Sequence, residues 1–394
     1  MAKYKNKAVS LCVLVLSVLA SMGIQANSGK LVTPNASPET RALYKNLSRL
    51  SGEYLLFGHQ NTTAYGVRWF GDENRSDVKD VTGSYPAVFG WDLGGLVPGN
   101  EVERNKSIMA NLTDEIKRTY RRGGVSTISW HMRDPVSGKS SWNKDHTVGK
   151  ILPGASHHDA LKAYLDLFVE FNEGLQVVDE NGKSHYIPVI FRPWHEHNGD
   201  WFWWGKGNAS EKEFVQLWRF TIDYLRNKKG LSNLIFAFSP DRSRMNVDDF
   251  RGSYLYAYPG DDYVDVLGID NYWDLGHPEN TTPLAKRKKY FVESLEAVTD
   301  LAEEKNKIAA LTEGGQETIH QEKFWTEMIL NNIQANDRTK RISWFLVWRN
   351  ANKEREKRDH YYAPYRGHKS EKDFMEFYNS PITLFENQLP DMYK

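Results

Sequence analysis

Cysteine is almost absent from the 394-residue sequence, in which Cys12 is the single example. The chain beyond it therefore has no residues for disulfides, a thiol nucleophile or thiolate metal sites. Neither sign of charge is in excess, because 51 basic residues balance 51 acidic ones. This balance gives no reason to expect a polyanionic partner such as nucleic acid.

Long apolar runs are missing after the first thirty residues, so no membrane-spanning helix is expected there. The first thirty have a basic start, then an apolar stretch of roughly a dozen residues, then small and polar residues. This pattern predicts a secretory signal peptide over residues 1–26, whose cleavage near Ala26 would also remove Cys12. We expect an exported protein, secreted or periplasmic, that is a monomer and uses no metal or other cofactor.

Eight short apolar runs divide the rest of the chain. They cover residues 54–60, 86–95, 125–135, 187–199, 234–241, 264–273, 308–315 and 342–350. Such runs are typical of strands buried on both faces of a parallel sheet. Amphipathic stretches at 159–175 and 290–305 predict helices between them. Eight successive units predict an α/β protein with a (β/α)8 TIM barrel, a single domain over residues 27–394.

An open, doubly wound sheet is the alternative to the barrel. No Gly-rich phosphate loop follows any of the eight runs, which argues against the nucleotide-binding version of that fold.

Nearly every run ends in a polar or aromatic side chain. These residues are His59, Asp92, His131, Glu196, Asp241, Tyr272, Glu313 and Trp348. In a (β/α)8 barrel the functional groups lie at the carboxyl ends of the strands. Single polar residues can simply cap strands, but a series of them predicts an active-site rim.

The segment FRPWHEHNGDWFWWG, residues 191–205, combines an ionisable cluster with a run of aromatic rings. A metal site, an aromatic core and a sugar-cleaving site are the three interpretations. The two histidines, His195 and His197, flank Glu196 without the His-Glu-x-x-His spacing or a second cluster of ligand residues, which disfavours a catalytic metal. High aromatic content, with 13 Trp and 20 Tyr, favours sugar stacking, although at least two of residues 201–204 are expected to be packing.

Strand alternation predicts that Trp194 and Arg192 share the face of Glu196, which puts Arg192 deeper in the barrel. A buried arginine needs a partner. The same alternation puts Glu313 on the face of Leu311, at the end of the seventh strand and across the barrel from Glu196. The two carboxylates can therefore converge on one bond.

Retaining cleavage of a glycosidic bond requires one protonated and one ionised carboxyl group. Arg192 beside Glu313 would keep Glu313 ionised. Aromatic neighbours would desolvate Glu196, raise its pKa and favour its acid form. Glu196 is therefore the predicted acid and Glu313 the predicted nucleophile.

Six motifs resemble, in the same order, those of glycoside hydrolase family 26, the β-mannanase family. They are FGHQN (57–61), WHMRDP (130–135), RPWHEHNGDWFWWG (192–205), IDNYW (269–273), LTEGG (311–315) and WFLVWRN (344–350). The resemblance covers nearly all of residues 45–390. It implies a (β/α)8 barrel and a double displacement, with Glu196 as acid/base and Glu313 as nucleophile. The EGG sequence departs from the commonest form after the nucleophile.

The resemblance also implies roles for the neighbouring residues. His195 is similar to the residue that positions the acid, and Arg192 and Tyr272 to hydrogen-bond partners of the nucleophile. Trp201 resembles the stacking residue on the leaving side. On the other side, Trp348 resembles the platform under the sugar being cleaved, Arg349 the contact to the next sugar, and His131 a further contact in that pocket.

Several functions remain open from the sequence. The leading one is hydrolysis of β-1,4 linkages in mannan, glucomannan or galactomannan. An exo mode that releases mannobiose competes with it, because residues 133–159 and the loop after Asp92 could block or line distant sugar sites. A family relative that acts on mixed-linkage β-glucan or β-1,3-xylan is a further candidate. An inactive sugar-binding barrel is disfavoured, because a binder needs neither glutamate.

Overall fold

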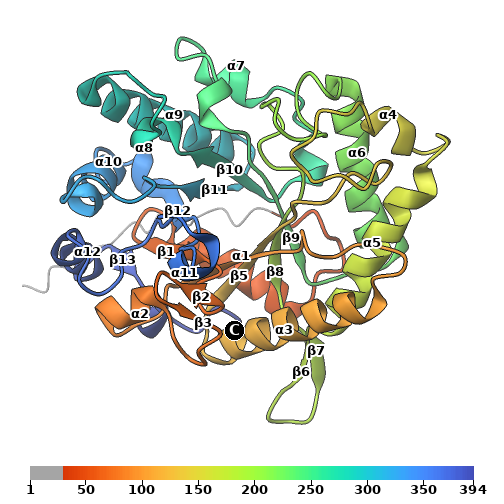
Figure 1. Cartoon of the computed structure of the whole chain (residues 1–394), viewed down its shortest axis with the longest axis horizontal. Coiled ribbons are helices and arrows are strands. Elements are labelled where there is room, and N and C mark those ends of the chain that lie inside the picture. The colour runs from red at the N-terminus through yellow and green to blue at the C-terminus, as the bar shows by residue number, and fades with distance from the viewer. Residues whose placement is uncertain (1–29) are drawn as a thin grey trace, which may run out of the picture.

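A closed barrel of eight parallel strands forms the centre of the molecule (Figure 1). The computed structural model describes residues 30–394, so the predicted signal peptide lies outside the described residues. In barrel order the strands are β1 Leu55–Gln60, β4 Val88–Asp92, β5 Val125–Ser129, β8 Val189–Arg192, β9 Leu234–Phe238, β10 Val266–Asn271, β11 Ile308–Gly314 and β12 Ile342–Val347. β12 pairs with β1 in parallel, which closes the sheet. The predicted TIM barrel is confirmed, and the alternative prediction of an open, doubly wound sheet is wrong.

Helices surround the strands, with α3, α5, α6 and α9 prominent in Figure 1. The α-helices are α1 Pro38–Leu50, α2 Asp77–Thr82, α3 Val102–Arg121, α4 Val148–Ile151, α5 His158–Glu173, α6 Glu211–Asp223, α7 Phe250–Tyr254, α8 Trp273–Gly276, α9 Leu284–Glu304, α10 Asn331–Ile333, α11 Lys353–Glu356 and α12 Glu371–Tyr378. The predicted helices at 159–175 and 290–305 correspond to α5 and α9. Within residues 30–394, none of the helices has the length and apolar character needed to cross a membrane.

Five shorter strands lie outside the closed barrel. They are β2 Tyr65–Gly66 and β3 Trp69–Phe70, β6 Gln176–Val178 and β7 Ser184–Tyr186, which form two hairpins, and β13 Thr383–Leu384, which pairs with the start of β1.

Two buried layers follow from the alternation of side chains along the strands. The inner layer fills the barrel with residues such as Val88, Val125, Ile190, Ile235 and Leu346. α1 packs against the same cluster through its apolar face. The outer layer lies between the strands and the helices.

Side-chain alternation places three polar side chains inside the barrel, at the carboxyl ends of its strands. Ile190 and Ala237 belong to the inner layer, so the residues two positions later, Arg192 and Ser239, also face inward. Asp270 at the end of β10 joins them, and Arg192 donates to both Ser239 and Asp270. The barrel therefore ends in a polar layer at the carboxyl ends of its strands.

Candidate active site

A cavity of about 490 Å³ lies over this polar layer. It is lined by His131, Trp142, His195, Glu196, Trp201, Phe202, Asp241, Ser243, Arg244, Tyr272, Trp273, His277, Glu279, Glu313, Trp348, His360 and Tyr362. Six of the eight predicted strand-end residues are in this set. The exceptions are His59 and Asp92. His59 is buried and hydrogen-bonded to Thr62, and Asp92 is hydrogen-bonded to His131.

The turn that carries Glu196 does not continue the strand. β8 ends at Arg192, and both Trp194 and Glu196 have left-handed backbone angles, with φ of 50° and 53°. The Trp194 ring points away from the cavity and donates to Thr221 on α6. The prediction that Trp194 shares the face of Glu196 is therefore wrong, because strand alternation stops before this turn. Non-glycine residues with such angles are held in place by their surroundings and often occur at active sites.

Hydrogen bonds fix this turn to the neighbouring strand end. The backbone N–H of Glu196 donates to the Ser239 carbonyl at 2.8 Å. Asn198 and Asp241 exchange two bonds of 2.7 Å, one in each direction. The Glu196 carboxyl group consequently has a fixed direction over the barrel mouth.

Glu313 reaches the same place through a β-bulge in β11. Leu311 packs in the outer layer, so strict alternation would also turn Glu313 outward. The pairing of β10 with β11 shifts at this point, and Thr312 is the extra residue. The prediction that Glu313 shares the face of Leu311 is wrong, and the bulge is the reason that Glu313 still faces the cavity.

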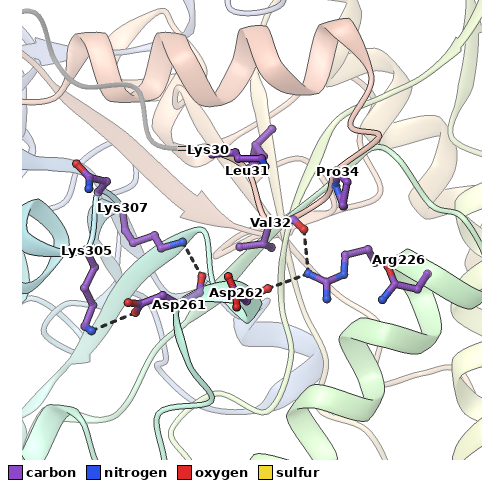
Figure 2. A pocket seen from close by; sticks show the side chains of 11 residues that line it. Lys30, Leu31, Val32, Pro34, Arg226, Asp261, Asp262, Lys305 and Lys307 are labelled. Atoms are coloured by element: carbon purple, nitrogen blue, oxygen red, sulfur yellow. Dashed lines mark hydrogen bonds and ion pairs between the residues drawn. The ribbon is translucent and has the colours of Figure 1, made fainter.

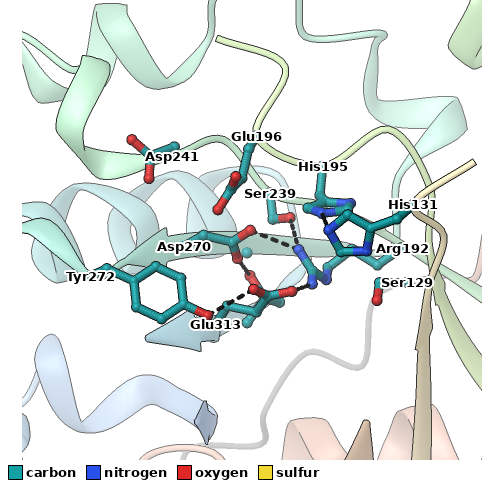
Figure 3. A network of polar contacts seen from close by, with 12 residues as sticks. Ser129, His131, Arg192, His195, Glu196, Ser239, Asp241, Asp270, Tyr272 and Glu313 are labelled. Atoms are coloured by element: carbon teal, nitrogen blue, oxygen red, sulfur yellow. Dashed lines mark hydrogen bonds and ion pairs between the residues drawn. The ribbon is translucent and has the colours of Figure 1, made fainter. Parts of the chain in front are cut away.

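Arg192 has the buried partners that its position requires. Its guanidinium donates to Asp270 at 2.7 Å and forms an ion pair with Glu313, while the Tyr272 hydroxyl donates to Glu313 at 2.9 Å (Figure 3). The predicted contacts of Arg192 and Tyr272 with Glu313 are confirmed. Asp270 was not identified from the sequence as a site residue. Two features of the sequence pointed to it: Asp270 lies two residues before Tyr272, and strand alternation puts it on the same face as Gly268.

Three carboxyl groups meet at the cavity floor. One oxygen from each of Glu196, Asp270 and Glu313 lies within 4.8 Å of the others, a spacing that could hold a metal ion. Arg192 already pairs with two of them, and its positive charge would repel a divalent cation. The arrangement fits a carboxylate pair served by an arginine better than a metal site.

The environment of Glu196 favours its protonated form. Burial raises its pKa well above the usual range, and the nearby carboxylates of Asp241, Asp270 and Glu313 add to this effect. Trp201 opposes it by donating its indole N–H to the Glu196 carboxylate at 2.8 Å. The predicted direction of the shift is confirmed, and burial is its largest cause.

The aromatic side chains after Glu196 lie in two different environments. Trp203 and Trp204 are fully buried and donate to the carbonyls of Met132 and His195, so the expected packing role is confirmed for both. Trp201 lines the cavity. Trp142, which was missed, also lines it and is 62% exposed, with its ring centroid 4.9 Å from that of Phe202.

Other predicted residues are placed less uniformly. His131, His195 and Trp348 line the cavity. Arg349 is absent from its lining and makes two hydrogen bonds to Glu356, of 2.5 and 2.9 Å. Its guanidinium also lies over the Tyr65 ring, 5.7 Å from the centroid. The predicted contact of Arg349 with a second sugar stays a prediction.

A second hollow, of about 570 Å³, lies at the opposite end of the barrel beside residues 30–34. Three of its cationic side chains make contacts within the protein itself (Figure 2). Lys305 pairs with Asp261, Lys307 donates to the carbonyl of Asp261, and Arg226 donates to the carbonyls of Val32 and Asp262. These contacts indicate a closure of the barrel base rather than a reaction site.

Comparison with known proteins agrees with this geometry. The sequence model of glycosyl hydrolase family 26 matches residues 32–365. A mannan endo-1,4-beta-mannosidase of Bifidobacterium adolescentis is 35% identical over 76% of this chain, which spans only 30% of that protein. A mannan endo-1,4-beta-mannosidase of Bacillus subtilis is 26% identical over 88% of this chain and 89% of its own length.

Solved structures include the GH26 beta-mannanase BoMan26A of Bacteroides ovatus. It is 39% identical to this chain, with a TM-score of 0.78 over 91% of this chain and 98% of its own. Fold, strand-end motifs and family match all coincide over the barrel. This chain belongs to glycosyl hydrolase family 26.

Proposed function

We propose that this chain is an exported hydrolase of β-1,4-mannosidic linkages in mannan, glucomannan or galactomannan. Glu196 is its acid/base and Glu313 its nucleophile in a retaining double displacement. The relatives named above as mannan endo-1,4-beta-mannosidases support the substrate class. The signal peptide predicted over residues 1–26 supports export.

The separation of the two glutamates carries the proposal. Retaining enzymes hold their carboxyl groups about 5–5.5 Å apart, whereas inverting enzymes need about 6.5–9.5 Å to admit a water molecule. Oxygen atoms of Glu196 and Glu313 lie within 4.8 Å of each other, which supports direct attack on the anomeric carbon.

Their surroundings support different roles for the two groups. Glu196 is buried and its pKa is raised, as an acid that protonates the leaving oxygen needs. Glu313 contacts a guanidinium and a tyrosine hydroxyl, which suit a carboxylate that attacks. In the second step Glu196 would act as base and activate the water that releases the sugar.

Variants of the two glutamates test these roles. Glu313→Ala should abolish turnover, and azide should rescue it to give an α-linked azido sugar. Glu196→Ala should lose most activity on polymer but keep more on an aryl mannoside whose leaving group needs no protonation. Equal losses of both variants on that aryl mannoside would contradict the assignment.

Product analysis tests the substrate and the mode of cleavage. Mannohexaose should be cleaved, and cello- and xylo-oligosaccharides of equal length should be spared. NMR should show the β-anomer as the first product, since two displacements retain configuration. Mannobiose as the only early product would favour the exo mode, cleavage of the cello- or xylo-oligosaccharides would favour a glucan- or xylan-acting relative, and no cleavage at all would favour a sugar-binding barrel.

A further inference from the structure

A line of hydrogen bonds connects Asp92, outside the cavity lining, with the residue before the acid/base. His131 Nδ1 lies 2.7 Å from Oδ2 of Asp92, and its Nε2 lies 3.3 Å from Nε2 of His195. Figure 3 shows the rings of His131 and His195 close together beside Arg192, and their planes are 78° apart. The mechanism proposed above gives Asp92 no role.

The Asp92 carboxylate is fixed from several directions. Its Oδ1 accepts from the Gly94 N–H at 2.7 Å, and its Oδ2 accepts from the Ser129 hydroxyl at 3.0 Å and the His131 N–H at 3.2 Å. Burial alone would raise its pKa, but His131 and these bonds outweigh burial and the pKa is lowered. An ionised carboxylate only accepts, so Nδ1 of His131 must carry a proton.

This constraint passes to the next ring. In neutral His131 a protonated Nδ1 leaves Nε2 as an acceptor, so Nε2 of His195 must be the donor. His195 is buried and its pKa is far below the usual value, which makes the ring neutral and leaves its Nδ1 bare. That Nδ1 is buried and has no hydrogen-bond partner in the described chain. Leaving a buried acceptor without a partner costs less free energy than leaving a buried N–H without one.

We propose that Asp92 is a positioning residue which, through His131, holds His195 in its Nε2–H tautomer and so orients the turn that carries Glu196. The backbone supports this link, because the His195 carbonyl accepts from the Trp204 indole at 2.9 Å and Glu196 follows directly. The kinetic consequence rests on the proposed function, whereas the tautomer does not.

The charges around His131 determine the pH at which this hydrogen-bond arrangement changes. The charged and titratable groups near it are the carboxyl groups of Asp92 and Glu313, the Arg192 guanidinium and the His195 ring. Burial would lower the pKa of His131, but the two carboxylates outweigh it and the pKa is raised. A second proton on His131 would make Nε2 a donor, and His195 would have to release its Nε2 proton or lose the contact.

Imidazole ¹⁵N NMR of the full chain tests the tautomer without any substrate. Above the pH at which His131 titrates, His195 should show a protonated Nε2 and an unprotonated Nδ1, with its signals assigned by their loss in His195→Gln. Asp92→Asn should lower the pH at which His131 titrates and mix the two tautomers of His195. The matched control is Asp265→Asn, which removes a buried carboxylate at the barrel base and should leave both rings unchanged.

Kinetics on mannohexaose form the second arm. Asp92→Asn should lower kcat about tenfold or more, the effect of weakening one charge-assisted hydrogen bond, with little change in KM. An unchanged His195 tautomer in folded Asp92→Asn would overturn the proposal, with or without a fall in kcat. If the unmodified chain cleaves no mannan, the proposed function fails, but the NMR arm still decides the role of Asp92.

Discussion

The indole N–H of Trp201 donates to the Glu196 carboxylate at 2.8 Å, so this ring contacts the proposed acid directly. The sequence indicated a ring that desolvates Glu196 and stacks on the leaving side, but not this hydrogen bond. A bond to the charged form of a carboxyl group lowers its pKa. Trp201 therefore limits how far burial raises the pKa of Glu196.

Trp201→Phe should separate stacking from hydrogen bonding. The variant keeps a ring but loses the N–H, so the pKa of Glu196 should rise and the alkaline limb of the kcat/KM–pH profile should move to higher pH. Trp201→Ala should also lose stacking, about 1–3 kcal/mol of transition-state binding on mannotriose and longer chains. A Trp201→Phe profile that matches the unmodified enzyme would show that the bond has no influence on the acid.

Arg192→Met should move the acidic limb of the pH–rate profile to higher pH. The variant removes the cation that Glu313 contacts, which makes protonation of the nucleophile easier. Loss of a buried partner should also destabilise the fold by about 3–5 kcal/mol, so rates must be measured on folded protein. Arg192→Lys is the control, because lysine keeps the positive charge but lacks the paired N–H donors of the guanidinium. It should return the acidic limb toward its original pH while the rate stays reduced. An unshifted limb in folded Arg192→Met would disprove the pairing.

Trp203→Ala and Trp142→Ala should differ in what they damage. Trp203 is fully buried, and its truncation should reduce the free energy of unfolding by about 3–5 kcal/mol. Trp142 is 62% exposed in the cavity lining, so its truncation should leave the melting temperature nearly unchanged and raise KM for long oligosaccharides. Melting curves and KM values on mannohexaose check both, and a stability loss in Trp142→Ala would instead assign that ring to packing.

Gly199→Ala should displace the Trp201 ring. A Cβ at position 199 would lie 2.3 Å from that ring, which is closer than any real contact allows. We expect the variant to reproduce the kinetic loss of Trp201→Ala on mannotriose with a smaller change in melting temperature. Gly95→Ala is the control, because its Cβ would meet first the movable end of the Ile108 side chain, outside the cavity lining. Normal kinetics in Gly199→Ala would mean that the ring has another position.

The sequence determined the architecture and the inventory of the site. Eight apolar runs, each with a polar or aromatic end, predicted the barrel and the edge at which function would lie, because apolar patterning depends on residues close together in the chain. The identities of Glu196, Glu313, Arg192 and Tyr272 followed from motifs at those ends.

Tertiary structure alone decided how these side chains meet. Alternation failed at the two proposed catalytic positions, since Glu196 lies in a turn with left-handed backbone angles and Glu313 follows a bulge. Asp270 reaches Arg192 from another strand, and Asp92 reaches His131 in the same way. Trp142 reaches the cavity from a distant loop. Strand periodicity describes a regular backbone, whereas bulges, turns and contacts between strands are set by which distant groups must share buried hydrogen bonds.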